Sequence, residues 1–207
     1  MDTGGTSPGW LVFLVQLPRT PSSARVALWR KLRASGATGL VNGAWVLPHT
    51  AGHARLFAQL RETVRERGGK AVVLPAGEPD PATGKMIVEC FRADRAREYD
   101  ELAERCGAFL AEIEKETGAG KFIFAELEEN EQELDKLARW LGKIQARDFF
   151  PDERYAAAGE MVERCRQALR GFTRRVYEAE DVRVAPDVPP EDVPPLDGPP
   201  EDGPSSC

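Results

Sequence analysis

The stretch "GATGLVNGAWVLPHT", residues 36–50, constrains the fold of this chain more than any other segment. Two short apolar runs, Gly39–Val41 and Ala44–Leu47, flank the dipeptide Asn42-Gly43. Asn-Gly suits a tight turn because both residues tolerate positive φ, and between two β-prone runs it is a strong hairpin signal. We therefore expect two antiparallel strands here, forming the centre of a sheet.

The segments on either side of this hairpin complete an α+β module over residues 10–76. "WLVFLVQLP" and "KAVVLPA" are apolar runs typical of strands. "TPSSARVALWRKLRASG" and "TAGHARLFAQLRETVRERGG" have helical patterns, the second beginning at Thr50 and ending at Gly68-Gly69. The β-α-β-β-α-β order predicts a ferredoxin-like fold with both helices on one face of an antiparallel sheet. A winged helix, which is also rich in hairpins, is the alternative.

The rest of the chain reads as a linker, a helical region and two disordered ends. Residues 77–84 are rich in turn formers and predict a linker, and the following "KMIVECF" fits either a fifth strand or the start of a helix. Over residues 85–178 three amphipathic helices predict an antiparallel bundle, or long arms that pack on the sheet or on a partner. Residues 1–9 and the Pro/Asp-rich residues 179–207 predict a disordered leader and tail. The residues expected to face inward in the three helices are Tyr99, Leu102, Cys106, Phe109 and Ile113; Leu134, Leu137, Leu141 and Ile144; and Met161, Cys165, Leu169, Phe172 and Val176.

Composition places the protein in the cytoplasm with no membrane partner. No apolar run approaches the roughly 20 residues of a membrane helix, and the most apolar segment, Trp10–Val15, has no basic region before it. The four cysteines, Cys90, Cys106, Cys165 and Cys207, are far apart and form no Cys-x-x-Cys pair. We therefore expect reduced thiols and no secretory signal.

The net charge of −6 conceals a strongly uneven distribution. Residues 1–75 contain ten lysines and arginines against three acids, a net charge of +7, which leaves −13 for the remainder. A basic module in an acidic protein favours a local anionic partner, either nucleic acid or an oxyanion. An ordinary solvated face explains the same pattern equally well.

Six cations of this module are candidate contacts to nucleic-acid phosphates. Arg25 shares a helical stripe with Leu28 and Leu32, so we expect it near the buried face, where it either caps strand-end carbonyls or binds an oxyanion. The next three cations of the same segment should point outward, toward phosphates or simply toward solvent. The complete set is Arg25, Arg30, Lys31 and Arg33 on the first helix, with Arg55 and Arg61 on the second.

The residues indicate neither an enzyme nor a metal or cofactor site. No phosphate loop, no paired thiols and no acid–histidine pair occur in any short window. His49 and His53 have a spacing that bridges a metal on a helix, but no acid or cysteine between them completes a site. We expect His53 to pack on the apolar face of its helix and His49 to lie at the helix start, where His49 is also a candidate oxyanion contact.

Two longer stretches resemble a known family. "WLVFLVQLPRTPSSARVALWRKLRASGATGLVNGAWVLP" and "EIEKETGAGKFIFAELEENEQELDKLARWLGKIQARDFF" are similar to the N-terminal region of ChrB-type chromate-resistance proteins. The likeness covers roughly residues 9–178, and its specific parts are Arg25–Arg33, the Asn42–Pro48 hairpin, "RADRAREYDEL" and "FAELEENE". The hairpin segment is also similar, more weakly, to the ferredoxin-like module of PaaX-type repressors and of a CRISPR-associated nuclease.

The resemblance implies a regulator. ChrB proteins are regarded as chromate-responsive transcriptional regulators of chromate-efflux genes, which implies operator DNA and chromate or another oxyanion as partners. We also expect a homodimer. Where the nuclease has an acidic metal ligand, this chain has Gln16-Leu17-Pro18, so nuclease activity is not expected. The C-terminal chromate-resistance domain of full-length ChrB proteins is missing here, so this form is expected to bind partners without necessarily sensing chromate. The alternative is an oxyanion-sensing module, through Arg25 and His49, or a protein-interaction module without DNA binding.

Overall fold

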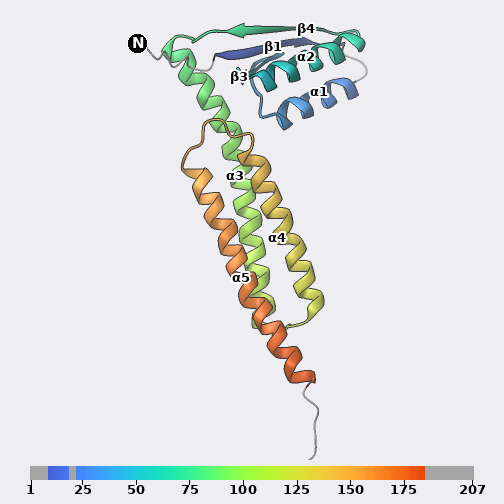
Figure 1. Cartoon of the computed structure of the whole chain (residues 1–207), viewed down its shortest axis with the longest axis vertical. Coiled ribbons are helices and arrows are strands. Elements are labelled where there is room, and N and C mark those ends of the chain that lie inside the picture. The colour runs from blue at the N-terminus through green and yellow to red at the C-terminus, as the bar shows by residue number, and fades with distance from the viewer. Residues whose placement is uncertain (1–8, 19–21, 185–207) are drawn as a thin grey trace, which may run out of the picture.

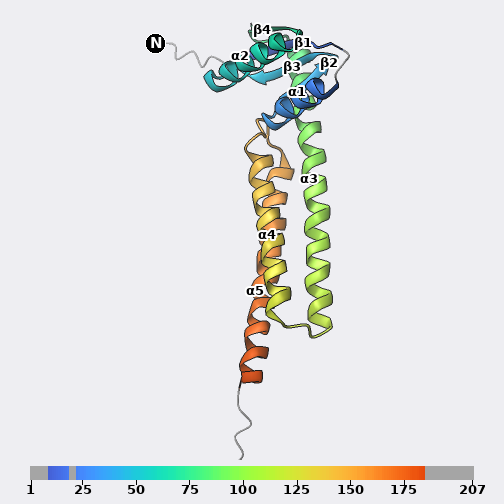
Figure 2. The same cartoon turned by 90° about the vertical axis from the view of Figure 1, so that its right-hand side faces the viewer.

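The computed structural model describes residues 9–18 and 22–184. Within these residues the chain forms four strands and five helices, which confirms the predicted α+β class. A sheet module lies at one end of the molecule, and three long helices extend away from it (Figure 1, Figure 2). Of the predicted leader and tail, residues 1–8 and 185–207 lie outside the described residues.

The sheet module has the predicted β-α-β-β-α-β order. Its four strands form a single sheet in the order β2-β3-β1-β4, and every neighbouring pair is antiparallel. The expectation that both hairpin strands are central is wrong for β2, which is an edge strand because β1 pairs with β4 on its other side. The elements are β1 (Trp10–Gln16), α1 (Ser22–Ala34), β2 (Thr38–Val41), β3 (Ala44–Pro48), α2 (Ala51–Glu66) and β4 (Lys70–Ala76).

The hairpin turn is fastened to the neighbouring strand. Gly43 has a φ of +79°, and a Cβ atom at this position would lie 2.6 Å from the Val15 carbonyl oxygen. The Val15 N–H donates to the Gly43 carbonyl oxygen at 2.7 Å. Glycine is required here both for its backbone conformation and for the close approach to β1.

The two faces of the sheet are covered by different parts of the chain. Helices α1 and α2 lie on one face, where Leu28 and Leu32 of α1 and Phe57 of α2 pack with Phe13 of β1 (Figure 1). The side chain of Thr50 accepts the His53 N–H at 3.0 Å and starts α2 where the sequence predicts it. On the other face, Trp10 and Val46 pack against Ile87 and Phe91 of α3.

Helix α3 (Pro81–Gly118) begins inside the predicted linker. Asp80 accepts the N–H groups of Ala82 and Thr83, both at 3.1 Å, and Pro81 occupies the first turn. An acidic cap followed by proline is a helix start signal, so the linker shortens to residues 77–80. The segment "KMIVECF" is therefore helical and not a fifth strand.

Helices α4 (Phe124–Gln145) and α5 (Glu153–Val184) complete an antiparallel three-helix bundle with α3. This is the first of the two predicted arrangements, the other being long arms packed on the sheet or on a partner. The predicted inward positions are buried, with one exception in α5, where Met161 is half-buried and Val162 takes the buried position. Helix α5 continues to Val184, so the tail predicted from residue 179 begins later.

The bundle core contains two thiols that should be unreactive. Cys106 and Cys165 are fully buried, and the Cys165 thiol donates to the Cys106 carbonyl oxygen at 3.7 Å. Burial raises the pKa of Cys106, and burial together with the nearby Cys106 raises the pKa of Cys165 to about 12. The thiolate is the reactive form of cysteine. Both thiols should therefore be unreactive at neutral pH, because the bundle core keeps reagents away from them and because their raised pKa values keep them protonated.

We expect a thiol reagent at pH 8 to modify one thiol per native chain in a Cys207→Ser background. The half-buried Cys90 should react first, and Cys106 and Cys165 only after unfolding in guanidinium. The measurement is a timed thiol titration with and without denaturant. Three thiols reacting together in the native protein would contradict the buried placement.

Candidate functional site

The outer surface of α1 and α2 carries the free cations among the predicted site residues. Arg30 and Lys31 on α1 and Arg55 on α2 are exposed, and within the described residues none has an ion pair or side-chain hydrogen bond. Arg61 is also exposed and lies 3.6 Å from Glu62. The two helices that carry these cations lie on the same face of the sheet (Figure 2).

Lys31 belongs to a small groove that runs between the two helices. The groove, about 60 Å³ in volume, is lined by Lys31, Thr63 and the exposed Arg67. Arg67 follows α2 and was not among the predicted contacts. The sequence offers a signal for Arg67, because the second helical segment ends in several arginines. These residues entered the sequence analysis only through the net charge of the module.

Arg25 is exposed and not near the buried face, which corrects the prediction for this residue. The buried stripe of α1 runs through Ala24, Leu28 and Leu32, one position away from Arg25. Its guanidinium donates to the Pro18 carbonyl oxygen at 3.4 Å, two residues beyond the end of β1, so it does cap a carbonyl near the strand end. Arg25 also lies at the rim of an apolar cavity of about 380 Å³ that Trp29 and Trp45 line.

His49 does not join Arg25 in an oxyanion site. The cavity beside Arg25 is lined by Asn42 and Gly43, which precede β3, whereas His49 follows the end of β3. At about 3.4 Å per strand residue the two positions are on the order of 15–20 Å apart. The His49 N–H donates to the Gly9 carbonyl oxygen at 2.6 Å. The neighbouring His53 is packed as predicted, with its ring at 5.2 Å from that of Phe149.

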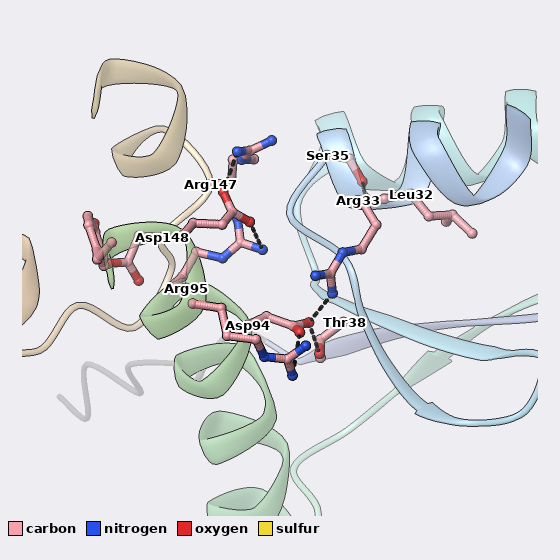
Figure 3. Close-up of polar contacts among 11 residues, drawn as sticks. Leu32, Arg33, Ser35, Thr38, Asp94, Arg95, Arg147 and Asp148 are labelled. Atoms are coloured by element: carbon pink, nitrogen blue, oxygen red, sulfur yellow. Dashed lines mark hydrogen bonds and ion pairs between the residues drawn. The ribbon is translucent and has the colours of Figure 1, made fainter. Parts of the chain in front are cut away.

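Arg33 points toward the helical bundle and not outward. Its guanidinium lies 2.7 Å from the Asp94 carboxylate on α3 and 5.6 Å from the Trp29 ring. The same Asp94 oxygen accepts the hydroxyl of Thr38, the first residue of β2, at 2.8 Å. Figure 3 shows these side chains meeting between the sheet module and α3. Arg33 is therefore a structural cation that ties α1 to α3.

A second set of ion pairs continues this contact into the bundle. One oxygen of Glu98 pairs with the buried Arg95 at 3.0 Å, and the other pairs with Arg147, which follows α4. The Tyr99 hydroxyl donates to Asp148 at 2.9 Å, and burial followed by this hydrogen bond raises the pKa of Tyr99. We call the whole set the joint cluster: Arg33, Thr38, Asp94, Arg95, Arg97, Glu98, Tyr99, Arg147 and Asp148.

The joint cluster was not predicted from the sequence, although one of the segments that carry the family resemblance contributes most of its residues. "RADRAREYDEL" supplies five of its residues, Asp94, Arg95, Arg97, Glu98 and Tyr99, and three of these five are buried. Charged residues at successive helical positions were taken as part of an amphipathic pattern. The sequence does contain one signal for this cluster. The charged residues Asp94 and Arg95 fall on the same helical face as the apolar Phe91 and Tyr99. Charged side chains are rarely buried unless they are paired, so their place on that face indicates buried partners.

A third buried polar group lies at the far end of the bundle. Glu116 on α3 is 4% exposed, and the Asn130 side chain donates to it at 2.7 Å and to the Glu126 carbonyl oxygen at 2.8 Å. Burial raises the pKa of Glu116, the Asn130 hydrogen bond opposes this, and Glu126 raises it further. The "FAELEENE" segment thus supplies a buried polar contact between α4 and α3.

We expect this carboxyl group to make stability depend on pH. The pKa of Glu116 is higher in the folded protein than in the unfolded chain. The carboxyl group therefore contributes its full stabilisation at pH values below the pKa of the unfolded chain, and this stabilisation is lost as the pH rises through the pKa of the folded protein. Glu116→Gln keeps an acceptor for Asn130 without the charge. The variant should be more stable than the wild type at pH 8 and equal to it near pH 4. Urea unfolding at both pH values checks this, with the exposed Glu114→Gln as control; equal stability at pH 8 would contradict the buried charge.

The described ranges contain neither a group of metal-binding side chains nor a membrane-spanning helix. Within residues 9–18 and 22–184 no group of three or more His, Cys, Asp or Glu residues is placed to hold a metal ion. None of the helices in this part of the chain is both long and apolar enough to cross a membrane.

Comparisons with known proteins identify the family. The family model described as "Protein ChrB, N-terminal" matches residues 25–183, which include most of α1, the hairpin, the joint cluster and nearly all of the bundle. The curated Protein ChrB of Cupriavidus metallidurans is 30% identical over 153 residues, covering 72% of this chain and 43% of that protein. This chain thus spans less than half the length of the curated relative it matches. The chain belongs to the family of ChrB N-terminal domains.

Proposed function

We propose that the protein is a DNA-binding transcriptional regulator of chromate-efflux genes. The family assignment supports an association with chromate resistance. The observation that carries the DNA-binding part is the exposed, unneutralised set of cations on α1 and α2. Binding, and not catalysis, is the proposed activity.

The charge of the described sheet module supports this proposal. Residues 22–76 contain nine lysines and arginines and two acids, a net charge of +7. One of these cations, Arg33, is neutralised by Asp94, whereas Arg30, Lys31, Arg55 and Arg67 remain exposed. Lysine and arginine bind DNA phosphates without reading sequence, so they fix affinity and position. No residue that reads base edges is assigned in this proposal.

We propose that a homodimer in the cytoplasm is the active form. A two-fold dimer presents two basic faces, and dimers of this kind bind two half-sites spaced by a helical turn of DNA. Light scattering during size-exclusion chromatography measures the mass of the free protein and of its DNA complex. A single chain per DNA duplex would remove the dimer from the proposal without affecting the phosphate contacts.

The test is binding to the DNA upstream of the protein's own coding sequence. With about four phosphate contacts, log K should fall with log[salt] at a slope near −3.6, about a 100-fold loss of affinity between 50 and 200 mM salt. Fluorescence anisotropy of labelled duplex measures the slope, and an unrelated duplex of equal length separates specific from general binding. Absence of binding at 50 mM salt, or binding that salt does not weaken, would overturn the proposal.

A further inference from the structure

Strand β4 forms an edge of the sheet whose outer side pairs with no strand of the described residues. It lies at the border of the sheet module (Figure 1), and β1 is its one partner strand within residues 9–18 and 22–184. It is seven residues long and pairs with β1 along its whole length without a register shift. A long, regular edge strand has a row of free N–H and C=O groups and readily pairs with a further strand, so native proteins normally cover or interrupt it.

The opposite edge of the sheet is interrupted in this way. Strand β2 is four residues long, and its register with β3 shifts between Gly39 and Val41. Its first residue, Thr38, is buried against Asp94 of α3. Strand β4 has neither a register shift nor a covering helix at its outer edge, which makes it the edge that can accept a further strand.

The exposed side chains in the middle of β4 are apolar. Val72 is 49% exposed and Leu74 is 45% exposed, on the sheet face that α3 covers only near Trp10. On β1, Leu14 lies opposite Val72 and is 40% exposed. Single exposed apolar residues are ordinary, but a contiguous apolar patch beside an unpaired strand indicates a contact with another chain.

The hydrogen bonds of β1 show which backbone groups of β4 point outward. The Val15 N–H donates to the Gly43 carbonyl oxygen on the hairpin side, so the odd-numbered residues of β1 face the hairpin and the even-numbered residues face β4. In the register of β1 with β4, the even-numbered residues of β4 bond back to β1. The residues whose backbone groups point away from the sheet are therefore Ala71, Val73 and Pro75. They offer two N–H donors, because proline has none, and three C=O acceptors.

This set of donors and acceptors is self-complementary about Val73. When β4 of a second copy lies antiparallel with the two Val73 residues opposite each other, these residues exchange two N–H···O bonds. The Ala71 N–H of each copy then faces the Pro75 carbonyl oxygen of the other copy. Every outward N–H group thus finds an acceptor, and the missing N–H of Pro75 leaves only the Ala71 carbonyl oxygen to water.

The same register also matches the side chains. Val72 of each copy lies opposite Leu74 of the other, so the apolar patches meet across the edge. Lys70, the one charged residue of β4, lies opposite Ala76 and diagonal to Glu78, an exposed acid two residues beyond the strand. Opposite charges are therefore close and like charges are not. A second copy of this chain supplies the donors, the apolar side chains and the charge in one arrangement, which makes it the favoured occupant of the edge.

We infer that two copies of this chain associate through their β4 strands, which pair antiparallel about Val73 and join the two sheets into one. This inference rests on the homodimer of the proposed function and names its surface. Because the two-fold axis is perpendicular to the joined sheet, α1 and α2 of both copies lie on the same face of it. The exposed cations of both copies then face the same side, where one DNA duplex can contact them.

The first experiment tests the strand register by disulfide formation. Val72 and Leu74 of the two copies form a non-hydrogen-bonded pair, whose Cα atoms are about 4.5 Å apart in antiparallel strands, within reach of a disulfide. Chains with Val72→Cys and chains with Leu74→Cys, both in a Cys90→Ser and Cys207→Ser background, are oxidised separately and after mixing in equal amounts. The mixture should give the most covalent dimer. A mixture that gives no more dimer than Val41→Cys, on the exposed β2 edge, or than either chain alone, would overturn the inference.

The second experiment measures the dimer without DNA. Leu74→Lys places a charge in the apolar contact of both symmetry-related pairs and should raise the dissociation constant of the dimer by about tenfold or more. Analytical ultracentrifugation measures the constant, and circular dichroism confirms that the variant is folded. Val41→Lys makes a similar change on the other edge strand and should leave the constant unchanged.

The outcomes separate this inference from the proposed function. An unchanged dissociation constant in Leu74→Lys would overturn pairing through β4 and leave a homodimer held by another surface. A wild-type protein that stays monomeric, free and on DNA, would overturn both the inference and the proposed dimer. Cross-linking through β4 in a protein that does not bind DNA would support the inference and overturn only the DNA-binding part of the proposed function.

Discussion

Replacing Asp94 with alanine should lower the free energy of unfolding by about 3 kcal/mol. The carboxylate is 7% exposed and holds Arg33 at 2.7 Å and the Thr38 hydroxyl at 2.8 Å. The substitution leaves the Thr38 hydroxyl buried without an acceptor and Arg33 without its counter-charge. Partial exposure of Arg33 moderates the loss, because its guanidinium can still reach water.

The same substitution should also separate the unfolding of the two parts of the molecule. The sheet module and the bundle have their own cores, and Asp94 connects them by ion pair and hydrogen bond beside a smaller shared core in which Trp10 and Val46 pack on Ile87 and Phe91 of α3. We expect a urea transition in Asp94→Ala that resolves into two steps, the module unfolding first. Circular dichroism and tryptophan fluorescence, which report mainly on helix and on the module respectively, should then give different midpoints.

The control for this prediction lies on the same helix. Asp100 is exposed on α3, and Asp100→Ala should change the free energy of unfolding by less than about 0.5 kcal/mol. Arg33→Ala and the double variant with Asp94→Ala complete a cycle whose interaction energy measures the pair itself. A single transition in Asp94→Ala at the wild-type midpoint would show that Asp94 does not hold the joint.

The double substitution Arg30→Ala with Lys31→Ala should weaken DNA binding by about 30- to 100-fold at 0.1 M salt. Removing two phosphate contacts reduces the slope of log K against log[salt] by about 1.8, and the loss is proportionally smaller at higher salt. Both residues are exposed and, within the described part of the chain, unpaired, so the variant should retain the stability of the wild type. Anisotropy titrations at three salt concentrations measure both quantities.

The structure determines which substitutions make a clean test. Arg33→Ala is unsuitable because it breaks the ion pair with Asp94 and changes stability together with charge. The matched control is Arg164→Ala with Arg174→Ala, which removes two exposed cations from α5 and changes the net charge equally. Equal losses of affinity in both double variants would indicate a general charge effect and contradict a binding face on α1 and α2.

Local sequence patterns predicted those parts of the fold that depend on interactions between residues close together in the chain. Asn42-Gly43 predicted the hairpin, because few residue pairs tolerate that turn, and Thr50 predicted the start of α2 through its capping side chain. Helical spacing predicted the faces of α3, α4 and α5. The start of α3 at Pro81 was missed because turn residues and cap residues are largely the same types.

The candidate site was predicted only in part. The cations of the first helix were all identified as one group, yet the structure separates them into exposed residues such as Arg30 and structural ones such as Arg33. Arg25 and His49 were placed in one oxyanion site, and the sheet holds them at opposite ends of β3. The buried Arg95, which pairs with Glu98 at the contact between the sheet module and the bundle, was not a candidate at all.

The sequence by itself determined the order of strands and helices, the hairpin, the inward faces of the bundle and the concentration of positive charge in the sheet module. Each of these features can be read from residues that are close together in the sequence. Only the tertiary structure decided which arginines are free and which are neutralised. Thr38 and Asp94 are 56 residues apart, and Arg147 and Glu98 are 49 apart. Electrostatic pairing depends on distance in space, and no local pattern encodes which distant carboxylate a guanidinium group will reach.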